Sequence, residues 1–447
     1  MTYPNSSAVT AGQATEADQY NNLRSDALCL GDDPAVSGTL RDLLYQGKGE
    51  IRLSRASKTA IRLEASEDAP CAMLIGGKIH SVSADLTVSV SADSLPQAGR
   101  YFLYAVGGSG TGFTLRAGDT SVPANGRKIG TFLWDGGGVV PETVHEISEW
   151  EALRKVCDPS LCQGRLTLVP GDPIPDADIR LADTLYFSPY DGNAAALYWD
   201  GGWEVFRFSE LSLNLSGMLR GIPHDVFLEA DADGPHLYAL SWGTSSARPA
   251  GMLIRIDGVR VSAGDNRKRY LGTIVLNASG YGEDSRSGRL LWNENHRLPR
   301  PLLAKLVTTK DQGSVHIGSW APYYDEDAPA VRLLVPFADT AFELEGVGIS
   351  SPIAEMDRQY SRLAAVGICR DMMTVSPYTG NENCAAVFTH SYGNSPMTVR
   401  VSNHDATFQG FHTYTLAFWA NYNFYPVGTT LRDTLGETPG LSGTIWA

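Results

Sequence analysis

Apolar and polar residues alternate with a period of two along much of the chain from about residue 50 onward. Successive side chains of a β-strand point to opposite faces of a sheet, so this alternation predicts half-buried strands. The clearest runs are residues 51–53, 61–63, 86–90 and 101–104. A glycine-rich tract at residues 107–112 lies between two strand-like runs. Because no helical pattern follows this tract, it predicts a hairpin loop and not a phosphate-binding loop.

Residues 1–32 follow a different pattern. Apolar or aromatic side chains recur close to helical spacing at Ala17, Tyr20, Leu23, Ala27 and Leu28. Thr15 precedes this run as a candidate N-cap, and Gly31 and Pro34 end it. The pattern predicts one short amphipathic helix. An isolated helix of this length is marginally stable in water, so it is expected to dock on another surface.

The middle of the chain contains an internal repeat. Gly76 and Gly77 recur as Gly201 and Gly202, and Phe102–Leu103 recurs as Phe227–Leu228, each 125 residues further on. The alternating run at residues 86–91 recurs at the same offset as residues 211–216, and residues 127–132 resemble residues 268–274 after an added hairpin around Asp257 and Gly258. Three ordered matches at one offset predict two related β-domains in tandem, which is typical of a spacer or stem.

A new region begins after the proline-bracketed turn at residues 297–301. Its strand-like runs are residues 331–335, 342–344, 363–368, 385–388, 397–401 and 414–419. Short strands separated by turn clusters predict a β-sandwich, here of jelly-roll type. The predicted fold is therefore mainly β. Its parts are an N-terminal helical anchor (1–32), a first β-domain (33–147), a second, related β-domain (148–301) that begins with a short helix at 148–156, and a C-terminal head (302–447).

Composition and charge narrow the function. The 46 glycines and the 19% of charged residues suit short strands and tight turns. The net charge is −14 without a basic block, which argues against nucleic acid as a partner. No apolar run has the length of a membrane span, and the N-terminus lacks the features of a signal peptide, so we expect synthesis in a cytoplasm and no membrane insertion. The six cysteines are scattered and do not form a disulfide framework.

Motifs for catalysis or metal binding are weak. Cys157 and Cys162 form the one close cysteine pair, and reduced thiols explain them better than a metal site. The acidic residues 229–234 predict a hairpin turn in preference to a calcium loop, because position 240 is Leu and not Glu. Residues 323–327 are acidic as well, and a solvated loop is favoured over a cation site. No Gly-x-Ser-x-Gly motif and no metal-ligand histidine pair occurs, so we expect no enzyme, no cofactor and no metal.

Aromatic residues are dense between Phe408 and Tyr425. The alternating Tyr414, Leu416 and Phe418 are expected to fill a core. The aromatic residues that follow could stack on a sugar or contact a protein receptor. These candidate receptor contacts are Trp419, Tyr422, Phe424 and Tyr425.

Three stretches together resemble the tail-fibre and receptor-binding virion proteins of tailed bacteriophages and related gene-transfer particles. The first is the helical segment at residues 17–28. The second is a mid-chain module, seen at residues 164–168, 185–190, 208–213, 269–273 and 291–293. The third is the C-terminal pattern of residues 410–414, Trp419 and residues 440–443. The resemblance implies a location in the virion and a homotrimer, and it carries no catalytic residues.

The sequence therefore predicts a trimeric structural fibre or spike. Gln19, Tyr20, Leu23 and Leu28 would attach it to other virion proteins, and the C-terminal head would bind a host surface glycan or protein. One alternative is a collar or head-fibre adaptor whose head binds another virion chain. A glycan depolymerase is a further alternative, because a carboxylate pair from distant parts of the chain leaves no sequence motif.

Overall fold

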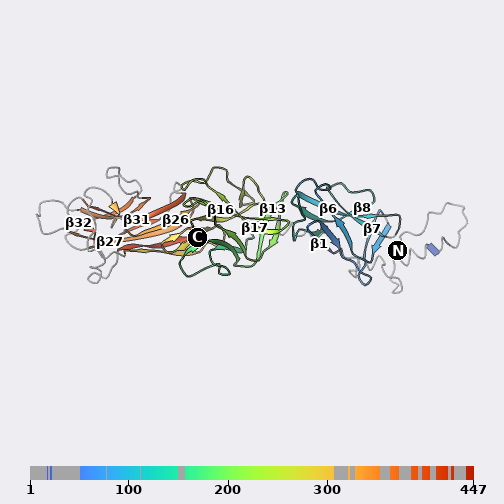
Figure 1. The fold of residues 1–447 in the computed structure, drawn as a ribbon, viewed down its shortest axis with the longest axis horizontal. Helices are drawn as coiled ribbons and strands as arrows, with labels where there is room; N and C mark the ends of the chain where they lie inside the picture. The colour runs from blue at the N-terminus through green and yellow to red at the C-terminus, as the bar shows by residue number, and fades with distance from the viewer. Residues whose placement is uncertain are drawn as a thin grey trace. The chain divides into compact units, whose positions relative to one another are not determined.

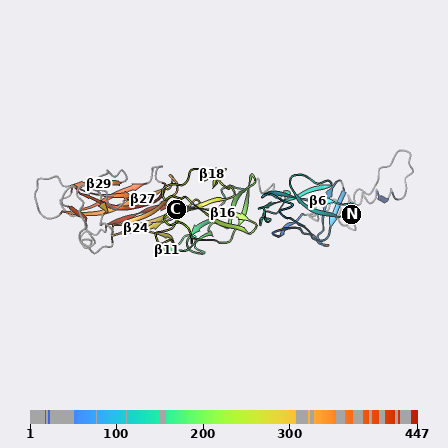
Figure 2. The same ribbon diagram turned by 45° about the horizontal axis from the view of Figure 1, so that its top comes forward.

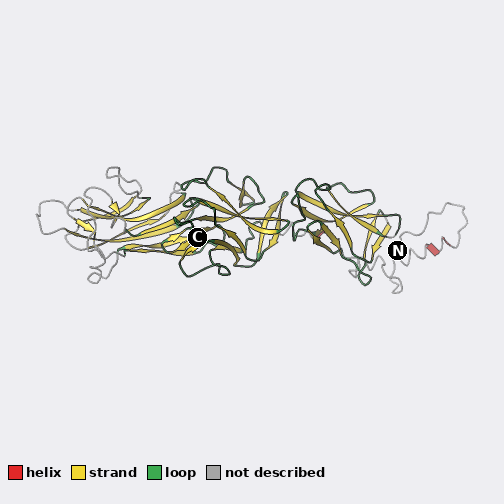
Figure 3. Ribbon diagram, in the orientation of Figure 1, coloured by secondary structure: helices red, strands yellow, loops and turns green. Residues whose placement is uncertain are grey.

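The computed structural model describes residues 18, 21–22, 51–76, 78–110, 112–148, 157–306, 321–322, 328–352, 363–371, 384–390, 395–402, 409–420, 424–426 and 439–447. These residues form 33 strands, β1 to β33, so the mainly-β prediction is confirmed (Figure 3). The predicted helices at 17–28 and 148–156 lie almost entirely outside the described residues. Within the described part of the chain, no helix is long and apolar enough to cross a bilayer.

The chain divides into two compact units. Unit 1 comprises Met1–Leu161, Ala195–Arg207 and Glu229–Pro235, and unit 2 comprises Cys162–Ala194, Phe208–Leu228 and His236–Ala447. This division differs from the four domains inferred from the sequence, which stay a prediction. The first set of strands described below lies in unit 1, and the second set draws strands from both units.

The first set of strands lies in unit 1 and is coloured blue to cyan in Figure 1. A three-stranded antiparallel sheet has the order β1-β2-β5, β3 and β4 form a hairpin, and a four-stranded sheet has the order β7-β6-β8-β9. The bounds are β1 Leu53–Ser57, β2 Ala60–Leu63, β3 Cys71–Ile75, β4 Lys78–Val82, β5 Leu86–Ser89, β6 Gly99–Gly107, β7 Phe113–Gly118, β8 Gly126–Trp134 and β9 His145–Glu146. One hydrophobic cluster fills the set, with Ile61, Leu103 and Phe132 fully buried at its centre.

A second set of strands repeats this plan. The three-stranded sheet has the order β10-β12-β15, β13 and β14 form a hairpin, and β17-β16-β20 continues through β23. The bounds are β10 Gly164–Thr167, β12 Thr184–Pro189, β13 Ala194–Trp199, β14 Gly202–Arg207, β15 Leu211–Asn214, β16 Pro223–Asp231, β17 Gly234–Ser241, β20 Arg269–Val275 and β23 Leu291–Asn293. The second set adds a hairpin of β18 (Leu253–Ile256) and β19 (Val259–Ser262) to its larger sheet. Each of the nine strands of the first set thus has a counterpart with the same pairing.

A shared β-bulge sharpens the alignment of the two sets. The register of β6 with β8 shifts between Leu103 and Tyr104, and the register of β16 with β20 shifts between Val226 and Phe227. Matching the bulges pairs Leu103 with Val226, so the offset in these strands is 123 and not the 125 read from Phe102–Leu103. A bulge places one extra residue on one strand and is easily missed by a comparison of residue types.

Glycines beside the bulge are equivalent in structure as well as in sequence. Gly130 lies opposite Leu103, and Gly272 lies opposite Val226. A Cβ atom at Gly130 would overlap Leu53 and the carbonyl oxygen of His145, and one at Gly272 would overlap Leu166 and the carbonyl oxygen of Trp292. In both sets the larger sheet therefore approaches the smaller one and its own edge strand closely at a glycine.

The C-terminal strands of unit 2 form two further sheets. One has the order β26-β31-β28-β29, and the other has the order β24-β33-β27-β30. These orders are those of the two four-stranded sheets of a jelly roll. The bounds are β24 Pro299–Lys305, β26 Ala330–Val335, β27 Phe342–Pro352, β28 Leu363–Arg370, β29 Cys384–His390, β30 Ser395–Ser402, β31 Gly410–Ala420 and β33 Gly440–Trp446. Each of the six strand-like runs predicted after residue 301 lies within one of these strands.

The first of these sheets continues through β22 (Gly288–Arg289) and β21 (Gly282–Ser285) to β11 (Ile179–Ala182). The short strands β25 (Ala321–Pro322) and β32 (Phe424–Pro426) pair with β31 and β27. One hydrophobic cluster contains Val331 and Leu416 from one sheet and Leu344 and Ile445 from the other. The same cluster contains Trp292 of the second set, so the second set and the C-terminal sheets share a core.

The cysteines include one bond that the sequence analysis did not predict. Cys369 is disulfide-bonded, and the register of β28 with β29 places Cys384 directly opposite it. Cys71 and Cys162 are buried and form no disulfide, and the half-buried Cys157 likewise forms none. Burial raises the pKa of the Cys71 thiol to about 11, which makes it a poor nucleophile at neutral pH. No group of three or more metal-ligating side chains occurs among the described residues.

Candidate functional site

The residues proposed from the sequence for attachment and receptor binding are only partly described. Gln19, Tyr20, Leu23, Leu28 and Tyr422 lie outside the described residues. Trp419 belongs to β31 and pairs with Ala365, whereas Phe424 and Tyr425 belong to β32 and pair with Pro352 and Ser351 of β27. The backbone thus places Trp419 and the Phe424–Tyr425 pair on different sheets. Their roles stay predictions.

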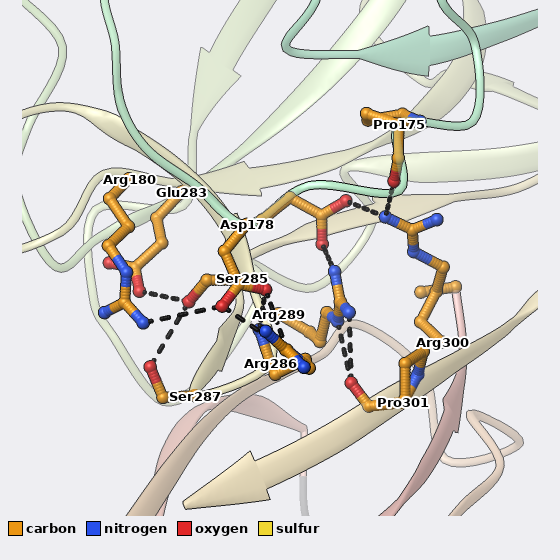
Figure 4. A network of polar contacts seen from close by, with 12 residues as sticks. Pro175, Asp178, Arg180, Glu283, Ser285, Arg286, Ser287, Arg289, Arg300 and Pro301 are labelled. Carbon is orange, nitrogen blue, oxygen red and sulfur yellow. Dashed lines mark hydrogen bonds and ion pairs between the residues drawn. The ribbon is translucent and has the colours of Figure 1, made fainter.

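The most elaborate polar arrangement in unit 2 surrounds the β21–β22 hairpin (Figure 4). Asp284 of β21 accepts hydrogen bonds from Arg289 Nη1 at 2.7 Å and from Arg300 Nη2 at 3.0 Å. Both guanidinium groups also donate to main-chain carbonyls, Arg289 to Pro301 at 3.0 Å and Arg300 to Pro175 at 2.9 Å. The three charged side chains are at most 12% exposed. This arrangement joins the segment before β11, the β21–β22 hairpin and β24.

Glu283 forms the second centre of the network. It accepts hydrogen bonds from Arg332 Nη2 at 2.7 Å, from Ser285 Oγ at 2.8 Å and from Asn277 Nδ2 at 3.3 Å. Arg332 lies on β26, so this contact adds a side-chain link to the parallel pairing of β22 with β26. Both oxygens of this buried carboxylate therefore have a hydrogen-bond donor.

Asp178 forms the outer part of the network. Burial alone would raise its pKa, but the main-chain N–H and the guanidinium of Arg286 outweigh that effect, so the pKa lies below its usual range. The Arg286 N–H donates at 2.9 Å, and Arg180 lies 3.7 Å from the other carboxylate oxygen. Arg286 and Arg180 are both 55% exposed, so this part of the network faces solvent.

Arg165 extends the cluster toward the end of β33. Its guanidinium donates to the carbonyl oxygens of His296 and Ala447. Burial lowers its pKa to about 10, and the charge of Arg300 acts in the same direction. The space between Arg165, Arg300 and Asp284 is about 10 Å³, which is room for at most about one water molecule. This centre is therefore filled by its own side chains and offers no ligand pocket.

A second buried cluster is centred on Asp225 of β16. The carboxylate accepts hydrogen bonds from Arg248 Nε at 2.7 Å, Trp242 Nε1 at 2.9 Å and Thr273 Oγ1 at 2.8 Å. Burial alone would lower the pKa of Arg248, but Asp225 raises it above its usual value. The Arg248 guanidinium carbon also lies 4.5 Å from the Trp242 ring centroid and 4.3 Å from that of Phe337. The ion pair is thereby enclosed by aromatic rings.

His412 and Asp371 form a close histidine–carboxylate pair. His412 Nδ1 lies 2.6 Å from Asp371 Oδ2, and Nε2 lies 3.2 Å from the carbonyl oxygen of Gln409. Both ring nitrogens therefore face oxygen atoms of the protein itself. Burial alone would raise the pKa of Asp371, but the hydrogen bonds from His412 and from the Thr413 N–H lower it. The pair is suited to holding the end of β28 against β31.

The network around Asp284 and Glu283, the Asp225 cluster and the His412–Asp371 pair all connect neighbouring strands and segments through buried polar contacts. Their chemistry is that of structural contacts. Each carboxylate is held by at least one cationic or main-chain donor. Ser285 contacts Glu283 as a hydrogen-bond donor. None of the three clusters is predicted from the sequence, because their partners lie as far apart along the chain as Pro175 and Arg300. One signal was available. The segment from residue 283 to residue 300 contains four arginines and three acidic residues in a stretch with strand-like runs.

Comparisons with known proteins do not place the chain in a family. No family model matches the chain, and no curated protein matches it. Among solved structures, the capsid protein VP2 of an infectious bursal disease virus subviral particle covers 92% of this chain and 78% of its own, with 10% identity and a TM-score of 0.20. Tripeptidyl peptidase 2 covers 59% of this chain with 10% identity and a TM-score of 0.16, and the match spans only 18% of that protein. A family 43 arabinoxylan arabinofuranohydrolase from Bacillus subtilis covers 89% with 12% identity and a TM-score of 0.13. Likeness at this level carries no argument about function.

Proposed function

We propose that this chain is a structural fibre or spike protein of a tailed-phage or gene-transfer particle. In this proposal it attaches through its N-terminal residues, its two tandem related β-domains form a stem, and its C-terminal jelly roll is the head. The observation that carries the proposal is the strand-by-strand repeat of β1–β9 in β10–β23. Serial copies of one module extend a chain without adding a catalytic centre, which is what a stem requires.

The buried charge clusters support the same proposal. Arg289, Arg300 and Arg332 tie β21 and β22 to β24 and β26 through Asp284 and Glu283. A buried ion pair costs several kcal/mol when one partner is removed, so such clusters resist a partial opening of the structure. Rigid junctions of this kind suit a protein that transmits load, whereas an active site leaves its carboxylates accessible to a substrate.

Imaging of the intact particle with a gold label on a tag after residue 447 would test the proposal. We expect the label on a projecting fibre, near the junction of the second set of strands with the C-terminal sheets, because Arg165 binds Ala447 there. A label in the particle interior, or its absence from purified particles, would contradict a role as an exposed spike. Pull-down with the full-length chain would distinguish host attachment, which enriches host cells, from an adaptor role, which enriches virion proteins.

The trimeric state is tested separately. Mass photometry of the purified full-length chain at micromolar concentration is expected to show a species of three times 48.2 kDa. A homotrimer is consistent with closed cyclic symmetry, which prevents open-ended growth. A purely monomeric sample would contradict the trimer while leaving the spike proposal to the imaging experiment.

A further inference from the structure

An insertion distinguishes the second set of strands from the first. The first set connects β7 to β8 through the seven residues 119–125, whereas the second connects β17 to β20 through the 27 residues 242–268. The insertion contains Arg248 and the β18–β19 hairpin. Since the first set builds the same sheets without it, the insertion is not needed to form the module.

The insertion builds a groove of about 330 Å³ on unit 2. Nine of its eleven lining residues belong to the insertion, namely residues 248–255 and Arg260, and Phe337 and Gln409 complete it. The wall contains apolar side chains, and Ile254 is 42% exposed. The groove is therefore open, partly apolar and lined by three arginines.

The edge of a β-sheet runs along this groove. β18 is the last strand in the order β17-β16-β20-β19-β18, and among the described residues it pairs only with β19 (Figure 2). Asp257 and Gly258 form the two-residue turn between them, with φ of 47° and 87°. Ile256 pairs with Val259 across this turn.

The register of β18 with β19 determines which N–H and C=O groups of β18 remain available to pair with another strand. In an antiparallel hairpin with a two-residue turn, alternate residue pairs exchange hydrogen bonds. The bond from Ala263 N to Met252 O, 3.1 Å long, fixes this phase in the hairpin. Leu253 and Arg255 therefore occupy non-hydrogen-bonded pairs, and their N–H and C=O groups point away from β19 toward the open edge. This edge can accept one more strand.

The charges along the groove favour an anionic partner. Arg255 lies directly opposite Arg260 in the register, and like charges in this position repel each other. Arg260 pairs with Glu294, and Arg248 pairs with Asp225. Arg255 donates to the carbonyl oxygen of Gly258 at 2.6 Å, and the described residues provide no carboxylate for it. The groove thus holds one guanidinium without a counter-charge at the open edge.

We propose that this groove binds an extended acidic peptide segment of another protein chain. The segment pairs with the open edge of β18, packs an apolar side chain beside Ile254 and places a carboxylate against Arg255. Strand addition uses main-chain hydrogen bonds for affinity and side-chain contacts for specificity. The outward N–H and C=O groups favour a peptide over an acidic saccharide, which has no regular row of amides to match them. The inference does not depend on the proposed function.

The first test measures binding of a defined probe to the full-length protein. The probe is a fluorescein-labelled Val-Glu-Val-Glu-Val-Glu peptide, followed by fluorescence anisotropy at low ionic strength. We expect saturable binding, and no binding of the matched Val-Lys peptide. Arg255→Glu should weaken binding by at least about tenfold, which corresponds to 1.4 kcal/mol. Arg116→Glu is the matched control, because Arg116 is an exposed arginine on the edge strand β7 of the first set.

Two further arms distinguish strand addition from simple charge attraction. The same peptide with N-methylated amides should lose binding, because it cannot donate to the edge of β18. Equal binding of the methylated peptide, or equal weakening by Arg255→Glu and Arg116→Glu, would overturn the proposal. Arg255-dependent binding of an oligogalacturonate in place of the peptide would also overturn it and assign the groove to an acidic glycan. Arg255→Gln, with its thermal unfolding compared to the parent, guards against a folding defect of the Glu variant.

Discussion

The two sets of strands share a backbone plan, yet they use one position of it in opposite ways. In the first set Lys128 lies 3.7 Å above the ring of Phe102. The bulge alignment places Asp225 at the position of Phe102 and Tyr270 at the position of Lys128. Asp225 and Tyr270 are both buried, and Arg248 from the insertion pairs with the carboxylate. The first set therefore has a half-exposed cation–π contact between Lys128 and Phe102. The second set has a buried ion pair between Arg248 and Asp225 at the equivalent position.

The hydrophobic cores of the two sets also differ. The first set encloses a cluster of its own residues, whereas Phe227, Tyr270 and Trp292 of the second belong to the cluster of the C-terminal jelly roll. The same arrangement of sheets thus occurs once with a core of its own and once with part of its core shared with the C-terminal sheets. Phe227, Tyr270 and Trp292 pack the second set against the C-terminal sheets, while the strand order of its own sheets stays that of the first set.

Asp225→Ala is expected to have the largest effect on this comparison. Removal of the carboxylate leaves Arg248 buried without a counter-charge, which costs about 3–5 kcal/mol in the free energy of unfolding. Urea unfolding of the full-length chain, followed by tryptophan fluorescence, measures the loss. Phe102→Ala at the equivalent position of the first set should cost clearly less. The double variant Asp225→Leu/Arg248→Met should recover most of the loss, and failure to recover would assign the effect to packing instead of charge.

The disulfide at Cys369 tests the shared core. Cys369 and Cys384 enclose a 14-residue segment, and a loop of about this size is stabilised by about 3 kcal/mol when it is cross-linked. Non-reducing peptide mapping should link these two cysteines. Reduction should then lower hydrogen-exchange protection in β31 and also in β20, because both strands contribute to one cluster. Protection in β8 should not change, and a loss of protection there would contradict the separation of the two cores.

Features that depend on neighbouring residues are predictable from the sequence, and features that combine residues from distant parts of the chain are not. Alternation placed the C-terminal strands, and Asp257–Gly258 located the β18–β19 turn, because both depend on neighbouring residues. The offset of 125 found the repeat but missed the bulge, since a bulge changes register without changing residue types. The Asp284 and Asp225 clusters combine residues from several strands, and only the folded topology brings them together. The Cys369 disulfide was within reach, because pairing the runs 363–368 and 385–388 as a hairpin would have placed the two cysteines opposite each other.

Glycine substitutions probe the close approach that both sets share. Gly130→Ala and Gly272→Ala should each destabilise the protein by roughly 1–3 kcal/mol, the usual cost of overpacking. The larger loss is expected at Gly272, where a Cβ atom meets the main-chain carbonyl of Trp292 first. At Gly130 the nearest atom is the flexible end of the Leu53 side chain. Thermal unfolding of the two variants measures the difference, and a larger loss for Gly130→Ala would show that the first set is the more tightly packed.

The smallest expected effects concern two surface aspartates that are held by different partners. Asp135 accepts hydrogen bonds from the N–H groups of Gly137, Gly138 and Ala232, and Asp265 is held chiefly by Arg267. Burial alone would raise the pKa of each carboxyl, but these partners lower it below the usual value. A lowered folded-state pKa means that each group stabilises the protein above the pKa of the unfolded chain, about 3.9, and that this stability is lost as pH falls through the folded-state pKa.

The stability effects of Asp265→Asn and Asp135→Asn should respond differently to salt. The half-buried Asp265–Arg267 ion pair lies near the surface, where such a pair contributes about 1 kcal/mol and is screened at high ionic strength. Asp265→Asn should therefore lower the stability at neutral pH in low salt and change it little in high salt. Asp135→Asn should show the same loss at both salt concentrations, because its partners are main-chain dipoles without net charge. Both variants should flatten the acid limb of the stability curve. Equal salt dependence in the two variants would mean that the turn of the first set also depends on a charged partner.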